Sequence, residues 1–512
     1  MKKVFVFLVA LVITLTVQAQ TNLIARIHFV GADQISADSN FAAFTNLFCS
    51  PEVHALEEQT LDKLAREPYE FLRARISERL ANQAERFRPL LDDLVSNEWL
   101  LEVRDATNGS PEFGLAIRLD HAHAQLWQTN LADALETWTK LPAGKIPDGW
   151  QLKKHLPPNL IRFARIGDWI VIGCGQDELP LNDEIAQRIL NEKRPVAEAE
   201  NYWLSLDVNW PRLAHWLPFT NQLNLPETSL QIFPKSGDLR FAGKLIYTQP
   251  LELQTESWRV PTNIISEPLV SFTALRGVQS WLEKQNGLKD IHDLLPNQVF
   301  VWALAQIPFQ SYITAPVQNP TNAIRELDEK MTNDFAARLE KYSLGSIQLA
   351  TNGTEIDWRG LPFVTPFVQA EHEAAGQFLF AGAFPNSPAS EPLPPELFAE
   401  LNRSNIVYYD WEITAERLPQ VLNLSQLAFL LTNHPQLDEN SAAAKWLKRI
   451  RPMLGNTVTE ITQTAPNELT LTRKAPGGLT AIEFVALAHW LEATNFPFDL
   501  HLPPLPKKLT TP

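Results

Sequence analysis

Two stretches of this chain have a similar order of expected strands, helix and hairpin, and this echo constrains the fold more than any single motif does. The first stretch, Tyr202–Tyr247, opens with an alternating strand pattern and closes with a hairpin pattern. In the second, Val407–Leu418 lines up with Tyr202–Leu213 at a constant offset, and Thr457–Lys474 supplies another hairpin. Repeats of this kind describe architecture rather than chemistry. They predict tandem, diverged modules, and the competing interpretation is a chance likeness between ordinary strands.

Turn signals between apolar or alternating arms recur along the chain. Gly-Asp and Asn-Gly dipeptides favour tight turns because these residues tolerate a positive φ angle. The four clearest turns are Gly167-Asp168, Gly237-Asp238, Asn352-Gly353 and Asn467-Glu468. Hairpins build antiparallel ladders, and helices must then cover a face of the sheet. The sequence therefore predicts an α+β fold of tandem diverged modules, each an antiparallel sheet with helices covering one face.

The length of the chain and local changes in its composition predict a division into modules. At 512 residues it exceeds what one hydrophobic core usually serves. We expect an N-terminal α+β module with long helices over residues 20–200, a middle α+β module over 201–384 and a C-terminal α+β module over 396–500. The Pro- and Ser-rich residues 385–395 are typical of a linker or exposed loop, and 501–512 of an irregular tail.

The N-terminus predicts export from the cytoplasm. Lys2 and Lys3 precede an unbroken apolar run over Val4–Ile13, which is too short to span a bilayer, and the small residue Ala19 suits cleavage directly after it. No later segment approaches the roughly 18 apolar residues that a membrane helix needs. We expect residues 1–19 to be a signal peptide, and the mature chain to be a soluble periplasmic or extracellular protein without a membrane span.

Charge and cysteine content exclude several classes of function. The formal net charge is −15, which gives no electrostatic footprint for nucleic acid or for an anionic membrane surface. Gly173-Cys174-Gly175 lacks the third glycine of a dinucleotide fingerprint, and no phosphate loop occurs, so no cofactor is predicted. Cys49 and Cys174 can pair in an oxidising compartment or stay as small buried apolar residues. The sequence leaves both interpretations open.

Histidines give the nearest approach to a metal motif. His121 and His123 would share a face on a strand, but they lie where a helix is expected to begin, and no third ligand is nearby. His372 lies between Glu371 and Glu373, without the His-Glu-x-x-His spacing of zinc proteases. No metal site is predicted.

Asp410 and Glu412 give the nearest approach to a catalytic pair. Two residues apart on a strand, they share one face beside a tryptophan, and glycoside hydrolases use paired carboxylic acids. The echo argues against catalysis, because its first copy has Ser205 in the place of Asp410. We therefore predict no catalytic residue here. We expect an ordinary strand with one buried face and one solvent-exposed face. The expected buried face is Tyr409, Trp411 and Ile413, and the expected solvent face is Asp410, Glu412 and Thr414.

Tryptophan is unusually frequent, with 15 Trp against 7 Tyr. Exposed indoles stack on sugars, whereas buried indoles belong to the core. The apolar pattern of the segments that carry them favours the core. Six of these residues lie in the middle part of the chain: Trp203, Trp210, Trp216, Trp258, Trp281 and Trp302.

The early strand Ala25–Gly31, the long helices and the hairpin Arg165–Gly173 resemble those of large exported bacterial proteins classed as domains of unknown function. The resemblance covers most of the mature chain. It contains no diagnostic motif and implies no activity or site.

These observations favour an exported protein that binds a ligand or has a structural role in the cell envelope, rather than an enzyme, with its ligand and partners unknown. One alternative is a hydrolase of glycans or other envelope polymers, whose carboxylates come together only in space. Another is a carrier of an apolar ligand held between a curved sheet and its helices. A deep polar cleft with two facing carboxylates would favour the hydrolase. A closed apolar cavity would favour the carrier, and shallow surfaces would favour the binding or structural protein.

Overall fold

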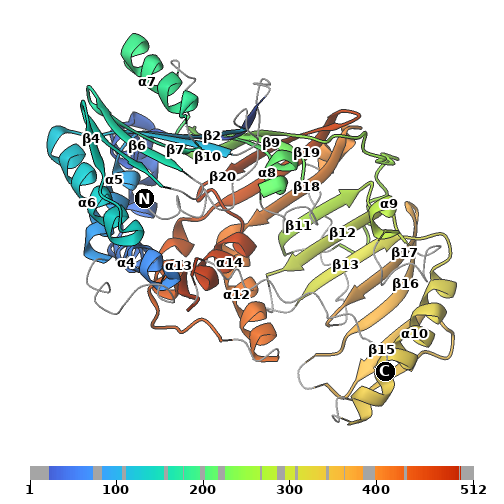
Figure 1. Ribbon diagram of the computed structural model, residues 1–512. Coiled ribbons are helices and arrows are strands. Elements are labelled where there is room, and N and C mark those ends of the chain that lie inside the picture. Colours follow the sequence, from blue (N-terminus) through green and yellow to red (C-terminus); the bar gives the residue numbers. More distant parts are fainter. Residues whose placement is uncertain are drawn as a thin grey trace. The chain divides into compact units, whose positions relative to one another are not determined.

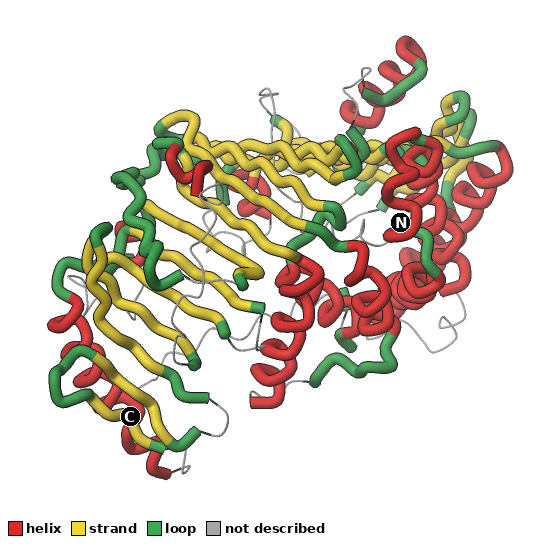
Figure 2. Tube along the Cα trace, turned by 180° about the vertical axis from the view of Figure 1, so that it is seen from behind, coloured by secondary structure: helices red, strands yellow, loops and turns green. Residues whose placement is uncertain are grey.

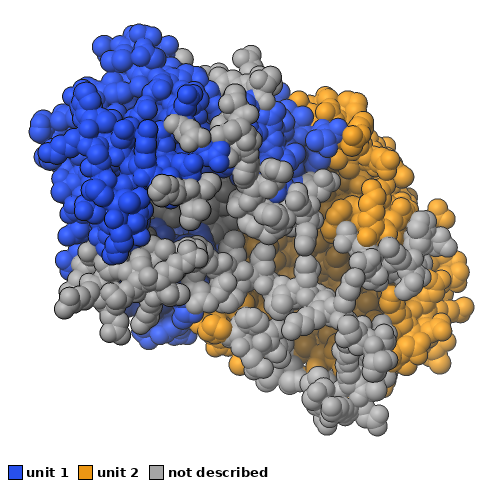
Figure 3. Space-filling model, viewed as in Figure 1, with its two compact units in different colours: residues 1–248, 437–453, 486–512 blue, residues 249–436, 454–485 orange. Residues whose placement is uncertain are grey.

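A computed structural model places the chain in two compact units, which Figure 3 shows in different colours. Unit 1 comprises residues 1–248, 437–453 and 486–512, and unit 2 comprises residues 249–436 and 454–485. This division cuts the chain at residues other than the borders of the modules expected from the sequence. The structure describes residues 22–72, 84–105, 111–154, 159–176, 178–196, 202–216, 225–265, 268–284, 295–305, 310–341, 345–361, 364–384, 398–431, 435–494 and 496–497. The expected signal peptide (1–19), linker (385–395) and tail (501–512) lie outside these ranges.

An antiparallel sheet forms the centre of unit 1. Its hydrogen-bonded strand order is β4-β5-β6-β7-β3-β2-β1-β8-β9-β10. The strands are β1 (Leu23–Phe29), β2 (Trp99–Asp105), β3 (Pro111–Arg118), β4 (Gly144–Ile146), β5 (Gly149–Lys153), β6 (Leu160–Ile166), β7 (Trp169–Gly175), β8 (Leu204–Asn209), β9 (Glu227–Lys235) and β10 (Asp238–Ile246).

Unit 2 is also built on an antiparallel sheet, whose strands run side by side in yellow in Figure 2. Their order is β14-β15-β16-β17-β13-β12-β11-β18-β19-β20. The strands are β11 (Leu269–Arg276), β12 (Gln298–Leu304), β13 (Ser311–Pro316), β14 (Ser346–Leu349), β15 (Glu355–Arg359), β16 (Phe367–Glu373), β17 (Gly376–Gly382), β18 (Ile406–Ile413), β19 (Asn456–Ala465) and β20 (Glu468–Ala475).

Helices accompany both sheets. In the described ranges of unit 1 they are α2 (Ala32–Ala37), the 3-10 helix η1 (Ser39–Phe44), α3 (Thr45–Phe48), α4 (Pro51–Leu72), α5 (Ala84–Ser96), α6 (His121–Thr139), α7 (Pro180–Glu192), α8 (Trp210–Trp216), α13 (Ala442–Ile450) and η6 (Arg451–Met453). Those of unit 2 are α9 (Gln279–Leu282), α10 (Pro320–Lys341), η5 (Glu400–Asn402), α12 (Thr414–Leu431) and the first turn of α14 (Ala481–Glu492). No helix in the described ranges is long and apolar enough to cross a membrane.

The two sheets share one topology. When strands are numbered from the first strand of each unit, both orders read 4-5-6-7-3-2-1-8-9-10. The helices that follow the third strand, α6 and α10, also correspond, as do α8 and α12 after the eighth strand. Both α8 and α12 pack on the first, eighth and ninth strands of their own unit.

Antiparallel strands mixed with helices confirm the α+β prediction. Each of the four predicted turns joins two paired neighbours, namely β6–β7, β9–β10, β14–β15 and β19–β20. In both echoed stretches a strand runs directly into a helix, as β8 with α8 and as β18 with α12. Strands β4, β5, β13 and β16 were not predicted; β4 has only three residues, and β16 (Phe-Val-Gln-Ala-Glu-His-Glu) lacks alternation.

Strand β2 shows that helices cover both faces of the unit 1 sheet. On one face Leu100 packs in an apolar cluster with Leu181 and Ile185 of α7. The neighbouring Trp99 points to the opposite face, where its indole Nε1 donates to the carbonyl of Leu94 in α5 over 2.7 Å. Figure 1 shows α7 and α5 on opposite sides of this sheet. Helices on one face only are therefore not confirmed.

An aromatic cluster forms the core of unit 2. Trp302 on β12 is fully buried and stacks on Phe380 of β17, with ring centroids 5.5 Å apart. Tyr312 of β13 tilts against both rings, and Phe272 stacks on Phe300. Burying large aromatic side chains contributes strongly to stability. The cluster fixes β11, β12, β13 and β17 as the rigid centre from which the loops of this unit project.

Candidate functional site

A polar cavity of about 640 Å³ in unit 2 is the best candidate for a site. It lies where β11 and β13 end and β12 begins, beside the N-terminus of α10. Most of the lining side chains are polar, and only four prolines and aliphatic residues contribute. The polar lining consists of the carboxamides Gln254, Gln279, Asn297, Gln318, Asn319 and Asn322 and of the charged residues Glu256, Arg259 and Glu326.

One wall of this cavity is the extended segment Gln254–Arg259, held in place by two buried amides at the start of β12. Asn297 donates through Nδ2 to the carbonyl of Gln254 over 2.7 Å. Gln298, which is fully buried, donates to the carbonyl of Ser257 over 2.8 Å and accepts from the backbone N–H of Arg259 over 2.9 Å. The strand therefore provides this irregular segment with the hydrogen bonds that a neighbouring strand would otherwise supply.

Arg276, the last residue of β11, holds the same wall from behind. Its guanidinium is buried, donates to the backbone carbonyls of Glu256 (2.6 Å) and Ile406 (2.7 Å), and lies 4.6 Å from the ring centre of Trp258. Burial lowers the pKa of Arg276, and Glu256 partly opposes this. Because its described partners are backbone carbonyls, this cation fixes the position of the wall.

The other walls also depend on local backbone requirements. Gly277 has a φ angle of 77°, and its N–H donates to the carbonyl of Asn297 over 2.9 Å, so the chain turns away from β11 directly beside the start of β12. Asn319 caps α10, since its Oδ1 accepts from the backbone N–H of Asn322 over 3.1 Å. Pro320 then occupies the first helical position, which has no backbone acceptor for an N–H.

Two buried polar atoms in the lining have no partner among the described residues. Asn297 is 8% exposed, and because its Nδ2 donates to a carbonyl, the orientation of its amide is fixed and its Oδ1 is an unpaired acceptor. The Nε of Arg259 is an unpaired donor. An unsatisfied buried polar group costs about 1–3 kcal/mol. A polar ligand that donates to Asn297 and accepts from Arg259 would remove both costs.

The cavity has little net charge to offer a ligand. A terminal nitrogen of Arg259 lies 3.2 Å from Glu256, so these two side chains largely neutralise each other. Each carboxamide in the lining can both donate and accept a hydrogen bond. The arrangement can therefore bind neutral groups that also donate and accept.

A second cavity, of about 420 Å³, lies in the corresponding place of unit 1. It is found where β1 and β3 end and β2 begins, beside the N-terminus of α6, which Asp120 caps through its Oδ1. Its chemistry differs, because Asp33, Glu98, Asp120 and Asp168 line it against the single cation Arg118. The two units thus place cavities of different chemistry at the same position of one topology.

Behind the unit 1 cavity, Glu98 belongs to a buried polar relay. Its Oε1 lies 3.2 Å from Nε2 of His28, whose Nδ1 lies 2.9 Å from the hydroxyl of Tyr202. Burial would raise the pKa of Glu98, but the hydrogen bond and charge of His28 outweigh it and the pKa is lowered. Burial raises the pKa of Tyr202 to about 12. These groups satisfy one another inside unit 1.

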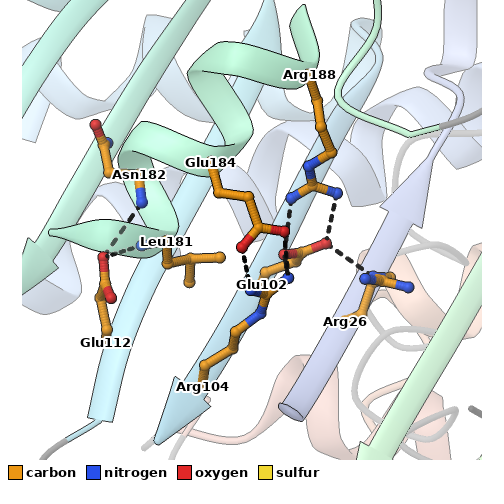
Figure 4. Close-up of polar contacts among 8 residues, drawn as sticks. All are labelled: Arg26, Glu102, Arg104, Glu112, Leu181, Asn182, Glu184 and Arg188. Carbon is orange, nitrogen blue, oxygen red and sulfur yellow. Dashed lines mark hydrogen bonds and ion pairs between the residues drawn. The ribbon is translucent and has the colours of Figure 1, made fainter. Parts of the chain in front are cut away.

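An ionic cluster in unit 1, drawn in Figure 4, is a rival candidate. Glu102 is fully buried on β2 and pairs with Arg26 (2.8 Å), Arg188 (2.9 Å) and Arg104 (3.1 Å), while Arg104 also pairs with Glu184 of α7. Burial alone would raise the pKa of Glu102, but the three arginines outweigh the effect of burial, so the pKa is lowered. Because the charges pair with one another, we interpret the cluster as an anchor for α7.

The expected solvent face of β18 is wrong. Asp410 is 8% exposed and Glu412 is 4% exposed, because α12 and the start of α14 cover this face. Asp410 accepts from Thr273 over 2.6 Å, and Glu412 accepts from the backbone N–H of Ala481 over 2.7 Å. Burial raises the pKa of both carboxyl groups. For Glu412, burial and the nearby charge of Asp410 together raise the pKa to about 7. Thr414, also expected outside, is buried.

The remaining candidate residues lie apart from the unit 2 cavity. His121 is exposed at the start of α6, and His123 Nδ1 lies 2.6 Å from Asp93. Cys49 and Cys174 are both free, so the disulfide alternative is wrong, and because Cys49 is exposed and Cys174 half-buried, the alternative of two buried apolar residues is wrong as well. Gly173-Cys174-Gly175 ends β7 and begins no helix, and His372 is exposed on β16. No group of three or more potential metal ligands occurs within the described ranges.

The tryptophans divide between core and surface. Trp203 and Trp302 are buried, as the sequence predicted, and the indole of Trp203 donates to Asp38 over 3.0 Å. Trp258 is half-buried against the aromatic core of unit 2. Trp281 differs, because 61% of it is exposed in the short helix that also carries Gln279 of the cavity.

Sequence reasoning missed the cavity because its lining comes from four separate segments of the chain. A local signal was present in Pro316–Asn322, where Asn319-Pro320 has the residues of a helix start flanked by further carboxamides. Neither Asn297 nor Arg259 belongs to any motif. Comparisons with protein-family models, with curated proteins and with solved structures found no match to this chain.

Proposed function

We propose that this chain is an exported, non-enzymatic binding protein of the cell envelope, and that the cavity of unit 2 holds its ligand. One observation carries this proposal. A 640 Å³ polar cavity has a buried acceptor on Asn297 and a buried donor on Arg259 that find no partner among the described residues. Native structures rarely leave such groups unpaired, and a bound polar molecule would satisfy both.

The alternative functions have weaker support. A glycan hydrolase needs two carboxyl groups that face a substrate. Asp410 and Glu412 are instead buried and hydrogen-bonded within unit 2, and neither lines one of the two cavities described. In the unit 2 cavity, Glu256 pairs with Arg259. A carrier of an apolar ligand needs an apolar lining, whereas carboxamides dominate this one.

The N-terminal sequence supports export. Lys2 and Lys3 ahead of a short apolar run are typical of a signal peptide, and the acid excess suits a soluble mature chain.

We also propose that the two units are tandem copies of one diverged module. The identical strand orders, the corresponding helices and the corresponding cavities support this duplication. Superposing β1–β10 on β11–β20 in order tests it. Strands that fail to overlay in their sequential order would reduce the correspondence to a shared general architecture.

Ligand-dependent thermal stabilisation tests the binding function. The purified mature protein is melted with small neutral saccharides, short peptides, polyamines, dicarboxylic acids and fatty acids, and incubated with glycans. A polar compound should raise the melting temperature in proportion to the logarithm of its concentration above Kd. Stabilisation by fatty acids alone would favour the apolar carrier, and release of reducing sugar ends would favour the hydrolase.

A further inference from the structure

We infer that the ligand of the unit 2 cavity is a neutral saccharide, an inference that rests on the proposed binding function. The cavity offers side-chain carboxamides, one unpaired acceptor and one unpaired donor, and these match the hydroxyl groups of a sugar.

Hydrogen-bond capacity favours hydroxyl groups. A carboxamide donates through its nitrogen and accepts through its oxygen, and a hydroxyl does the same through one atom. Gln254, Gln279 and Asn322 lie on different segments around the cavity, so a ligand that fills it meets such pairs from several directions. A sugar ring carries hydroxyls around its rim and can use all of them at once. A largely apolar or singly functional molecule would leave them unpaired, at a cost for each.

Charge argues against ionic ligands. Arg259 and Glu256 form an ion pair in the wall, which leaves Glu326 as the one further charged side chain among the described lining residues. An anionic ligand would find no free cation there and would meet a chain of net charge −15. A cationic ligand would meet a single carboxylate, whereas specific recognition of ammonium groups needs several acceptors or an aromatic cage. Among the described residues that line this cavity there is no aromatic side chain.

Peptides are the other neutral polymers with donors and acceptors, and the strand arrangement disfavours them. Proteins bind extended peptides by adding a strand to a free sheet edge. The cavity lies at the ends of β11, β12 and β13, each of which already has a paired strand on both sides. No free edge therefore meets the ligand, and side chains provide the contacts.

The geometry assigns specific contacts to this saccharide. One hydroxyl donates to Oδ1 of Asn297, whose orientation the carbonyl of Gln254 fixes. A second oxygen accepts from Nε of Arg259, whose backbone Gln298 holds in place. Removing either partner leaves a polar group of the bound sugar without its match.

Calorimetric titration of the full mature protein tests the assignment. The probes are maltotriose, cellotriose, triacetylchitotriose, trigalacturonate and triglycine. At least one neutral trisaccharide should bind, and Asn297→Ala should weaken it about tenfold or more, the equivalent of losing a hydrogen bond to a buried group. Arg259→Lys keeps the charge and the wall but removes Nε, and it should weaken binding several-fold. Asn97→Ala, at the corresponding place of unit 1, is the control and should change nothing.

Each result decides between the proposals. Binding of triglycine instead, sensitive to the same two substitutions, would overturn the saccharide and leave the binding function intact. Binding of trigalacturonate in preference to the neutral sugars would have the same consequence. A neutral saccharide whose affinity is unchanged in both variants would place the site elsewhere. No binding of any probe, together with no stabilisation in the wider ligand screen, would overturn the saccharide and the proposed function together. If Asn297→Ala fails to fold, Arg259→Lys alone decides.

Discussion

Glu412 is a buried carboxyl group whose ionisation costs the folded chain free energy. Burial and the charge of Asp410 raise its pKa to about 7, from a value of 4.5 for an unperturbed Glu. Between these two values the folded chain holds a proton that the unfolded chain releases, so the contribution of Glu412 to stability is greatest below about pH 4.5 and is lost as the pH rises from 4.5 to about 7. At about 1.4 kcal/mol per pKa unit, this loss is roughly 3 kcal/mol.

Substituting Glu412→Gln should abolish this loss. Urea unfolding of wild type and variant between pH 5 and pH 8 measures it, with Glu329→Gln on exposed α10 surface as the control. The wild type should lose stability relative to Glu412→Gln as the pH rises, while Glu329→Gln should follow the wild type. Parallel pH profiles for wild type and Glu412→Gln would show that Glu412 ionises normally in the folded state.

Helix α7 begins with two backbone N–H groups, those of Leu181 and Asn182, that donate to the buried carboxylate of Glu112, over 2.9 and 3.2 Å. Substituting Glu112→Ala removes this acceptor and should destabilise unit 1 by about 1–3 kcal/mol. Amide hydrogen exchange should accelerate most in the first turn of α7. The control is Glu192→Ala at the exposed end of the same helix. Unchanged protection in that first turn would refute a capping role for Glu112.

The hairpins of unit 1 contain two glycines with different requirements. A Cβ on Gly149 of β5 would lie 1.9 Å from the carbonyl oxygen of Phe163, so Gly149→Ala forces β5 away from β6. Gly167, in the turn between β6 and β7, has a φ angle of 60° but open space around it. We expect Gly167→Ala to cost about 1 kcal/mol, and Gly149→Ala to cost several-fold more. Equal losses in chemical denaturation would show that β5 moves away at little cost.

These elements show what the sequence could and could not predict. Turns such as Gly167-Asp168 depend on two adjacent residues, and strands such as β8 depend on alternation within six, so both are visible locally. The burial of Asp410 and Glu412 depends on α14, which begins about 70 residues later and donates the N–H of Ala481. The cavity likewise depends on strand pairing that brings Gln254, Asn297 and Asn322 together. No window of the sequence contains either arrangement.

At the scale of the whole molecule, the prediction that remains to be tested is export. Expression of the full chain in a bacterial host should yield a soluble protein whose N-terminus lies near Gln20, because a basic start and a short apolar run direct cleavage after Ala19. Intact-mass analysis of the exported fraction measures this directly. Retention of Met1-Lys2-Lys3 in that fraction, or recovery of the protein only from the cytoplasm, would contradict it.

The pairing of β1 sets the order in which unit 1 can assemble. On one side β1 pairs with β2, and on the other side it pairs with β8, where Ile27 lies opposite Leu206. The first strand in the sequence therefore gains its second neighbour only from one of the last strands of the sheet. Contacts this distant along the chain form slowly, because a long loop must close before they stabilise anything. A chain emerging N-terminus first therefore keeps one edge of β1 open until about 180 further residues have followed, because Ile27 pairs with Leu206. Such a delay is compatible with the proposed export, and until β8 arrives the open edge of β1 offers unpaired backbone groups to other chains.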